Sequence, residues 1–258
     1  MTQVRDVERR LFDWAPPSLA EDWDNVGQLV GTCEGEVHKI LVALDVTEAV
    51  VSEALAIGAD LIVSHHPVMN CTWHKVQNVR SDNAQGRLLM RLIRNGISVI
   101  CMHTNLDAAV GGVNDALANQ LGLQTPQPFN DEKIGRIGTL KSEIPLAEFI
   151  PFVVKSLGCN GLRYRDCGKP VYRVAVGGGA CGDFLAQVTE LGCDTFVTAD
   201  LSYHQFLDTT GINLIDAGHF PTENVICPVA VRFLQESFPA LTVLKTTSHC
   251  REVIQYFK

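Results

Sequence analysis

Short apolar runs that alternate with longer amphipathic segments constrain this chain more than any other feature. The runs at 39–44 (KILVAL), 60–63 (DLIV) and 97–101 (ISVIC) have the length and composition of buried strands. The segments 47–57 and 86–94 between them space their apolar residues as helices do. Strands that alternate with helices predict an α/β fold with largely parallel pairing.

The second half of the chain has the same organisation. After a helix at 113–121, the predicted helices are 183–191, 201–207 and 223–235, and the predicted strands are 172–176, 195–198, 212–215, 241–244 and 252–256. Two stretches also align by sequence, because 39–66 lies over 173–200 without a gap and 95–101 resembles 210–216. Self-similarity of this kind indicates a repeated structural unit.

The alignment places Gly58 over Gly192 and Asp60 over Asp194. Any two α/β units share some likeness, but here a glycine that ends a helix before a strand recurs at both places, which favours a duplication. We therefore expect two related α/β halves with mixed, largely parallel sheets and a metal site between them. The first half, with most of the metal ligands, is expected to comprise 1–125 and 218–258, and the second 126–217.

Polar residues that follow predicted strands are the candidates for chemistry. His65 and His66 come directly after the strand 60–63, and ligands of open parallel sheets gather at the carboxyl ends of strands. Neighbours on extended backbone point in opposite directions, so the two imidazoles would serve two nearby metals, one each. The alternative is a pair of ordinary polar loop residues.

Two further strand ends carry a histidine followed four residues later by a carboxylate. These pairs are His103 with Asp107 and His219 with Glu223. In a helical turn, positions i and i+4 face the same way, so each pair can converge on one point. For the second pair the alternative is a cap, with Thr222 at the start of a helix that begins near Glu223.

Four imidazoles and two carboxylates at strand ends suit zinc, iron, manganese or cobalt. A carboxylate can bridge two ions, and two adjacent ions activate a bridging water. The sequence therefore predicts two divalent metal ions per chain. A single metal, or histidines that do acid–base work without one, are the alternatives.

Four segments carry a resemblance to a known family. They are WDNVGQLVG (23–31), SHHPVM (64–69), HTNLDAAVGGVNDALA (103–118) and GHFPTEN (218–224). In this order they resemble the conserved segments of the NIF-three-like family, also labelled GTP cyclohydrolase I type 2 homologs. The chain resembles the compact form of that family, which has no inserted domain.

The resemblance implies a two-half α/β subunit, a dinuclear metal site and a ring-like homohexamer. It also implies the metal ligands, which are His65, His66, Asp107, His219 and Glu223. In this family pattern Glu223 bridges the two ions. His103 lines the same pocket as an extra ligand or as a proton-transfer group.

Other residues leave their roles open. The glycine-rich segment 177–183 (GGGACGD) would either cradle a phosphate on its N–H groups or allow a tight turn and close packing, and it lacks the lysine of a P-loop. Asp24 either edges the pocket or makes a turn, and Asp200 is a candidate for the pocket rim. His38 and His249 are expected at the surface.

Composition limits the functional classes. The formal net charge of −8 argues against a nucleic-acid binder that works by charge. No stretch approaches the ~18 apolar residues of a membrane helix, and the N-terminus is charged rather than secretory, so we expect a cytoplasmic protein. The nine cysteines include no C-x-x-C pair, which predicts reduced thiols rather than a zinc site.

The predicted metal centre favours a metal-dependent hydrolase, and the resemblance implies that it acts on a nucleotide-like small molecule. The family label points to GTP, although no sequence feature recognises guanine or a triphosphate. The alternative is a non-catalytic metal-binding or scaffold protein that forms a ring, or such a ring associated with nucleic acid.

Overall fold

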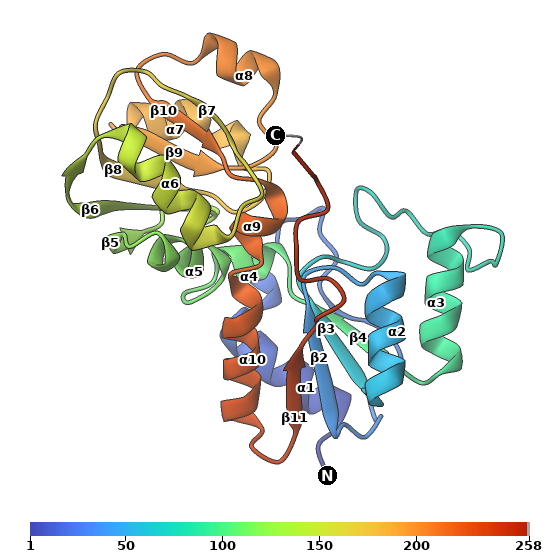
Figure 1. Ribbon diagram of the computed structural model, residues 1–258. Helices are drawn as coiled ribbons and strands as arrows, with labels where there is room; N and C mark the ends of the chain where they lie inside the picture. Colours follow the sequence, from blue (N-terminus) through green and yellow to red (C-terminus); the bar gives the residue numbers. More distant parts are fainter. Residues whose placement is uncertain (257–258) are drawn as a thin grey trace. The chain divides into compact units, whose positions relative to one another are not determined.

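Two separate sheets form, one in each of the two units into which the chain divides (Figure 1). The computed structural model describes residues 1–256. Unit 1 comprises Met1–Ala109 and Cys227–Cys250, and unit 2 comprises Val110–Ile226 and the chain from Arg251. The predicted α/β class with mixed sheets is confirmed.

The boundaries of the units differ from the expected ones at 110–125 and 218–226, which both belong to unit 2. Packing explains the difference. Helix α5 (Val113–Gln120) supplies Leu117 to the core of unit 2, and α9 (His219–Glu223) packs against α5. The last residues also belong to unit 2, because the Asn160 amide donates to the Ile254 carbonyl.

The sheet of unit 1 has the strand order β1-β4-β3-β2-β11. Its strands are β1 (Gly27–Val30), β2 (Lys39–Ala43), β3 (Leu61–Ser64), β4 (Ser98–Cys101) and β11 (Thr242–Lys245). All neighbours pair in parallel except β1, which runs antiparallel to β4. Every residue of β3 and β4 is buried, as the continuous apolar runs predict.

The helices of unit 1 cover both faces of this sheet. They are α1 (Val4–Trp14), η1 (Pro17–Leu19), α2 (Glu48–Ile57), α3 (Ala84–Arg94), α4 (Thr104–Ala108) and α10 (Ile226–Ser237). Figure 1 shows α2 and α3 on one side of the sheet and α10 on the other. Side-chain oxygens cap the N-termini of α2 and α3. The Thr47 hydroxyl accepts from the Val50 amide, and the Asn83 side chain accepts from the Gly86 amide.

The sheet of unit 2 has the order β5-β6-β8-β9-β10-β7. Its strands are β5 (Gln124–Gln127), β6 (Arg136–Ile144), β7 (Arg163–Arg165), β8 (Val171–Val176), β9 (Thr195–Thr198) and β10 (Asn213–Asp216). Strands β8, β9 and β10 are parallel. Strand β6 pairs antiparallel with β8, β7 with β10, and β5 with β6. The parallel strands were predicted, whereas β5, β6 and β7 were not.

The helices of unit 2 pack on the two faces of its sheet. Besides α5 and α9 they are α6 (Leu146–Leu157), η2 (Gly182–Phe184), α7 (Leu185–Glu190) and α8 (Tyr203–Asp208). Val174 lies in the core under α5 and α6, while its neighbour Ala175 lies in the core under α7 and α8. This alternation follows from the period of two in a strand.

The predicted repeat holds in the hydrogen bonds. The Asp60 carboxylate accepts from the His38 and Lys39 amides at 2.8 and 2.9 Å. The Asp194 carboxylate accepts from the amides of the aligned residues, Tyr172 and Arg173, at 3.0 and 2.6 Å. Both aspartates therefore fix the start of the neighbouring strand in the same way.

Strand register agrees with the alignment as well. In unit 1, Leu61 pairs with Ser98; in unit 2, Thr195 pairs with Asn213. These are the residues that the alignment equates. Gly58 and Gly192, which end the preceding helices, both adopt a positive φ, of 65° and 76°.

One predicted helix begins later than expected, and one predicted strand is absent. The helix expected at 223–235 is α10, which begins at Ile226, whereas Glu223 is the last residue of the separate helix α9. The strand expected at 252–256 does not form, because side chains take the backbone groups that a ladder would use. Glu252 accepts from the Ile254 amide, and Asn160 donates to the Ile254 carbonyl.

The cysteines agree with the prediction of reduced thiols. All nine are free, and five are buried, namely Cys71, Cys101, Cys181, Cys193 and Cys227. Among the described residues, no helix combines the length and the apolarity that crossing a bilayer requires.

Candidate metal centre

The carboxyl ends of β3 and β4 bring three imidazoles together in unit 1. His65 and His66 follow β3, and His103 follows β4, its parallel neighbour. One ring nitrogen of each lies within 4.8 Å of the others. His65 is 2% exposed and His103 7% exposed, so a cation in their midst would be largely shielded from water.

Each of these imidazoles is held through its Nδ1 atom. For His65, Nδ1 lies 2.8 Å from the Met102 carbonyl oxygen. A carbonyl only accepts, so Nδ1 carries the proton, and Nε2 of the neutral ring keeps its lone pair for a metal. Imidazole ligands of metals are commonly oriented by such a bond.

Asp24 holds His103 in the same way. Its Oδ1 atom lies 2.8 Å from His103 Nδ1, and its Oδ2 atom accepts from the Thr104 amide at 3.0 Å. Burial raises the pKa of this carboxyl, but hydrogen bonds from His103, Thr104 and Asn25 outweigh it and lower the pKa to about 2. Of the two roles considered for Asp24, a place at the pocket or in a turn, the contact with His103 favours the place at the pocket.

Asp45 holds His66, a contact that no sequence pattern indicates. Asp45 Oδ1 lies 2.6 Å from His66 Nδ1, and Oδ2 lies 2.8 Å from His249 Nε2. Burial raises the pKa of Asp45, but bonds from the two imidazoles lower it well below its usual range. The expected surface position of His249 is wrong, because only 12% of its side chain is exposed. His38, by contrast, is 71% exposed, as expected.

Asp107 adds a carboxylate to the cluster of unit 1. It lies in α4, is 7% exposed, and its Oδ1 atom is 3.7 Å from His65 Nε2. That distance exceeds a hydrogen bond, but it suits two donor atoms that face one ion.

Unit 2 carries a second group of donors in α9. His219 Nε2 lies 3.0 Å from Glu223 Oε2, so the predicted i,i+4 convergence is present. His219 Nδ1 lies 2.6 Å from Asp200 Oδ2. Burial lowers the pKa of His219, but Glu223 and Asp200 outweigh it and raise the pKa to about 11. The two carboxylates therefore strongly favour a positive charge at the His219 ring.

The capping role considered for Thr222 is wrong. The helix that contains Glu223 begins at His219, so Thr222 lies within it. The Thr222 hydroxyl donates to the Gly218 carbonyl at 2.9 Å and accepts from the Gly179 amide at 3.0 Å. Thr222 thus ties α9 to the glycine-rich segment.

The glycine-rich segment packs closely against the donors of α9. A Cβ at Gly179, which has φ +65°, would lie 2.1 Å from Glu223 Oε1 and 3.1 Å from His219 Nε2. The Gly178 amide already donates to the Asn114 side chain at 2.9 Å, as the Gly179 amide does to Thr222. The segment therefore makes room for side chains, and these two amides are not available to a phosphate.

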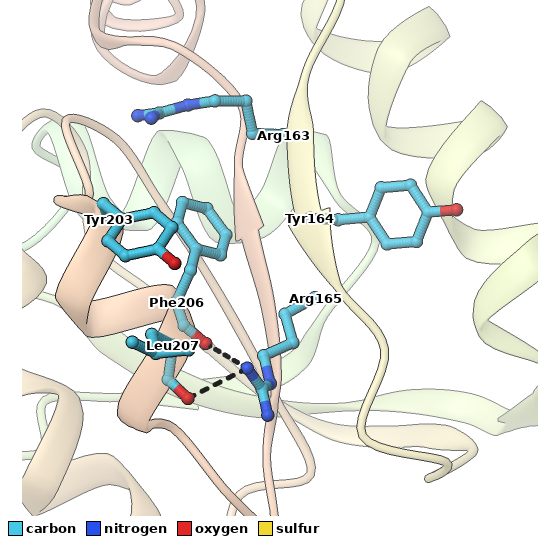
Figure 2. Close-up of a pocket in the computed structure, with 6 residues that line it drawn as sticks. All are labelled: Arg163, Tyr164, Arg165, Tyr203, Phe206 and Leu207. Atoms are coloured by element: carbon cyan, nitrogen blue, oxygen red, sulfur yellow. Dashed lines mark hydrogen bonds between the residues drawn. The ribbon is translucent and has the colours of Figure 1, made fainter.

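A cavity of about 410 Å³ between β7 and α8 holds none of the predicted ligands (Figure 2). Figure 2 shows Arg163 and Arg165 on the side of β7 that faces α8, with Tyr164 on the other side. Arg163 pairs with Asp216, and Arg165 donates to the Phe206 and Leu207 carbonyls at the end of α8. Both guanidinium groups thus stabilise unit 2 itself.

The donor atoms fit a divalent transition metal. All four imidazoles have Nδ1 bonded to an oxygen of Met102, Asp45, Asp24 or Asp200, so Nε2 is the ring nitrogen that could hold a metal ion. Carboxylates accompany the imidazoles in both units. Imidazole with carboxylate suits zinc, iron and manganese better than the all-oxygen preference of calcium or magnesium.

Comparison with known proteins gives a consistent result. The model of the Duf34/NIF3 (NGG1p interacting factor 3) family matches residues 2–251. A Clostridium perfringens protein named GTP cyclohydrolase 1 type 2 homolog is 37% identical over 230 residues, which cover 86% of this chain and 87% of the relative. A Streptomyces coelicolor protein of the same name is 34% identical over 250 residues, 92% of this chain and 87% of the relative. The crystal structure of a hypothetical Staphylococcus aureus protein superposes with a TM-score of 0.91 at 28% identity, covering 99% of both chains.

Proposed function

Because this chain belongs to the Duf34/NIF3 family and carries imidazoles held for metal binding, we propose that it binds two divalent metal ions and hydrolyses a nucleotide-like substrate. The five proposed ligands are His65, His66, Asp107, His219 and Glu223. The observation that carries the proposal is the uniform anchoring of four imidazoles through Nδ1, a pattern typical of metal ligands.

The metal ions would lower the pKa of bound water and so supply a hydroxide at neutral pH. The residues of the chain then have distinct tasks. Met102, Asp45 and Asp200 orient the ligand imidazoles through the bonds described above. The carboxylates of Asp107 and Glu223 would hold the ions together with the imidazoles and would balance their positive charge.

His103 is the proposed proton-transfer group. Its Nδ1 proton is held by Asp24, which leaves Nε2 to take a proton from water or to give one to a leaving group. Asp24 thus fixes the tautomer of His103, as the buried carboxylate of a catalytic triad does for its histidine.

Two exposed tryptophans beside His103 support a flat, aromatic substrate. Trp23 is 54% and Trp73 49% exposed. Their ring centroids lie 5.9 and 5.8 Å from that of His103. Large exposed indoles are uncommon without a partner, and nucleobases stack on them. The name of the relatives, GTP cyclohydrolase 1 type 2 homolog, agrees with such a substrate.

The experiment that tests the proposal measures metal content and turnover together. The purified full chain should hold two metal ions per chain and hydrolyse one of a panel of nucleotides in a metal-dependent way. Glu223→Ala should lower the metal content below two, whereas His103→Ala should abolish turnover. Exposed His38→Ala is the matched control and should change neither.

Two results would overturn the proposal. If Glu223→Ala keeps both ions, its role as a ligand is wrong. If the metal-loaded chain turns over no nucleotide, phosphoester or cyclic amide, the chain has a non-catalytic metal-binding role. The homohexamer, which is also proposed from the family resemblance, is tested by sedimentation of the same sample.

A further inference from the structure

The segment that follows β11 is held against helix α2. The Thr246 amide still donates to the Val42 carbonyl at 2.8 Å, which continues the pairing of β11 with β2. Glu53 of α2 then accepts from the Thr247 amide at 2.9 Å, the Ser248 amide at 2.9 Å and the Thr246 hydroxyl. The backbone up to residue 248 is thus fixed before His249 is reached.

His249 and His66 bind opposite oxygens of one carboxylate. His249 Nε2 lies 2.8 Å from Asp45 Oδ2, and His66 Nδ1 lies 2.6 Å from Asp45 Oδ1. A carboxylate bonded at both oxygens has lost its freedom to rotate about its last bond. The direction of the His66 ring therefore depends on a contact with a residue 183 positions further along the chain.

A purely structural role, in which His249 fastens the end of β11, explains less of this arrangement. Glu53 already fastens the segment through the amides of Thr247 and Ser248. The bond from His249 adds nothing to the start of that segment, but it fixes Asp45. Asp45 in turn lies 36% exposed, so without His249 its second oxygen would turn to water.

We infer that Asp45 and His249 are positioning residues for His66, acting in series: His249 fixes Asp45, and Asp45 fixes the Nδ1–H tautomer and the direction of Nε2. The inference rests on the proposed function in so far as His66 is a metal ligand. The arrangement is confined to unit 1, because the residue aligned with Asp45 is Gly179.

Metal titration of the full chain tests the series. With Zn²⁺ or Co²⁺ as the probe, Asp45→Asn should weaken binding about 10- to 100-fold, the usual loss for a partner of a metal ligand. His249→Gln should weaken it less. The double variant should bind as Asp45→Asn does, because His249 acts only through Asp45. The Co²⁺ absorption bands should shift in all three variants, and exposed His38→Gln should match the wild type.

Either of two results would overturn the inference. One is a His249→Gln variant with the metal affinity and the spectrum of the wild type. The other is a double variant whose loss of metal affinity equals the sum of the losses in the two single variants. If Asp45→Asn does not fold, the comparison of His249→Gln with the wild type still decides. The urea midpoint of the metal-free variants separates a loss of affinity from a loss of stability.

A measurement without metal separates this inference from the proposed function. Nitrogen NMR of the metal-free wild type should show His66 in the single Nδ1–H tautomer, and Asp45→Ala should show a mixture. If the wild type binds no metal, the proposed function fails, and the tautomer of His66 alone then tests whether Asp45 positions that ring. If His66 keeps one tautomer in Asp45→Ala, the inference is wrong even when metal binds.

Discussion

The two units share a three-stranded parallel core but carry different side chains at its carboxyl edge. Asp60 and Asp194 make the same bonds to the neighbouring strand, and the strand pairs have the same register. At the strand end, however, His65 and His66 of unit 1 align with Ala199 and Asp200 of unit 2. The scaffold is preserved where backbone amides need acceptors, and it varies where side chains leave the sheet.

The aligned positions have opposite roles in the two units: one holds a candidate metal ligand, and the other holds the carboxylate that orients a ligand. In unit 1 the aligned position holds a candidate ligand, His66, which Asp45 supports. In unit 2 the same position holds Asp200, which supports His219 of helix α9. Gly179, aligned with Asp45, leaves its space to the carboxylate of Glu223. Two copies of one scaffold thus present donors from different elements.

The largest expected effect comes from filling that space. In Gly179→Ala the new Cβ would lie 2.1 Å from Glu223 Oε1, and the carboxylate, at the end of a flexible side chain, would move. We expect metal affinity to fall about 100-fold, the upper end of losses for groups that orient ligands. Gly192→Ala is the control, because it shares the positive φ and has no atom within 4 Å. Titration of both variants checks the prediction, and equal affinities would contradict it.

Removal of the two aligned aspartates tests whether the scaffolds are equivalent. Asp60→Ala and Asp194→Ala each leave two backbone amides without their carboxylate acceptor. A hydrogen bond contributes about 1 kcal/mol net, so the loss of two such bonds should cost each unit about 2 kcal/mol. Hydrogen exchange in each unit measures the loss. Unequal losses would show that the same hydrogen-bond geometry contributes different amounts of stability in the two units.

The two helix-ending glycines should give a smaller, matched effect. Gly58→Ala and Gly192→Ala place a Cβ in open space but at a positive φ. The left-handed backbone costs a non-glycine residue about 1 kcal/mol, so both unfolding free energies should fall by that amount. A loss in one variant alone would mean that only one of the helices depends on its glycine.

The smallest effect concerns acid stability, and it has no counterpart in unit 2. Burial raises the pKa of Glu53, but bonds from Thr246, Thr247 and Ser248 outweigh it and lower the pKa from its usual 4.5 to about 2. The folded state therefore binds its proton less readily than the unfolded state. The stabilisation is present above about pH 4.5 and is lost as the pH falls towards 2. Urea midpoints of the wild type and Glu53→Gln should converge over this range, and a constant difference would contradict the assignment.

The sequence predicted the parallel cores of both units and much less of the antiparallel additions. Short segments rich in β-branched and apolar residues mark β3 (LIVS) and β9 (TFVT), whose residues are all buried. The outer half of β6 is polar and exposed, and α6 contains Pro151. Such strands and helices depend on packing against segments that are distant in the sequence, and no local sequence pattern predicts that packing.

The site divides in the same way. The candidate ligands stand at strand ends and in recognisable segments, so the sequence predicted their identities. Their supports are distant along the chain, since 79 residues separate Asp24 from His103 and 204 separate Asp45 from His249. These contacts follow from the path of the folded chain, and only an aspartate next to Trp23 in a family segment hinted at one of them.

The anchoring of every candidate imidazole through Nδ1 has a consequence for how the proposed metal ions would bind. The rings are oriented by bonds to the chain's own oxygens, so the conformational entropy of the ligands is lost during folding rather than during metal capture. Zinc fingers behave differently, because their chains are unfolded until the metal arrives. The candidate site is thus preorganised, and if it holds metal ions as proposed, they should bind and leave while the fold stays intact.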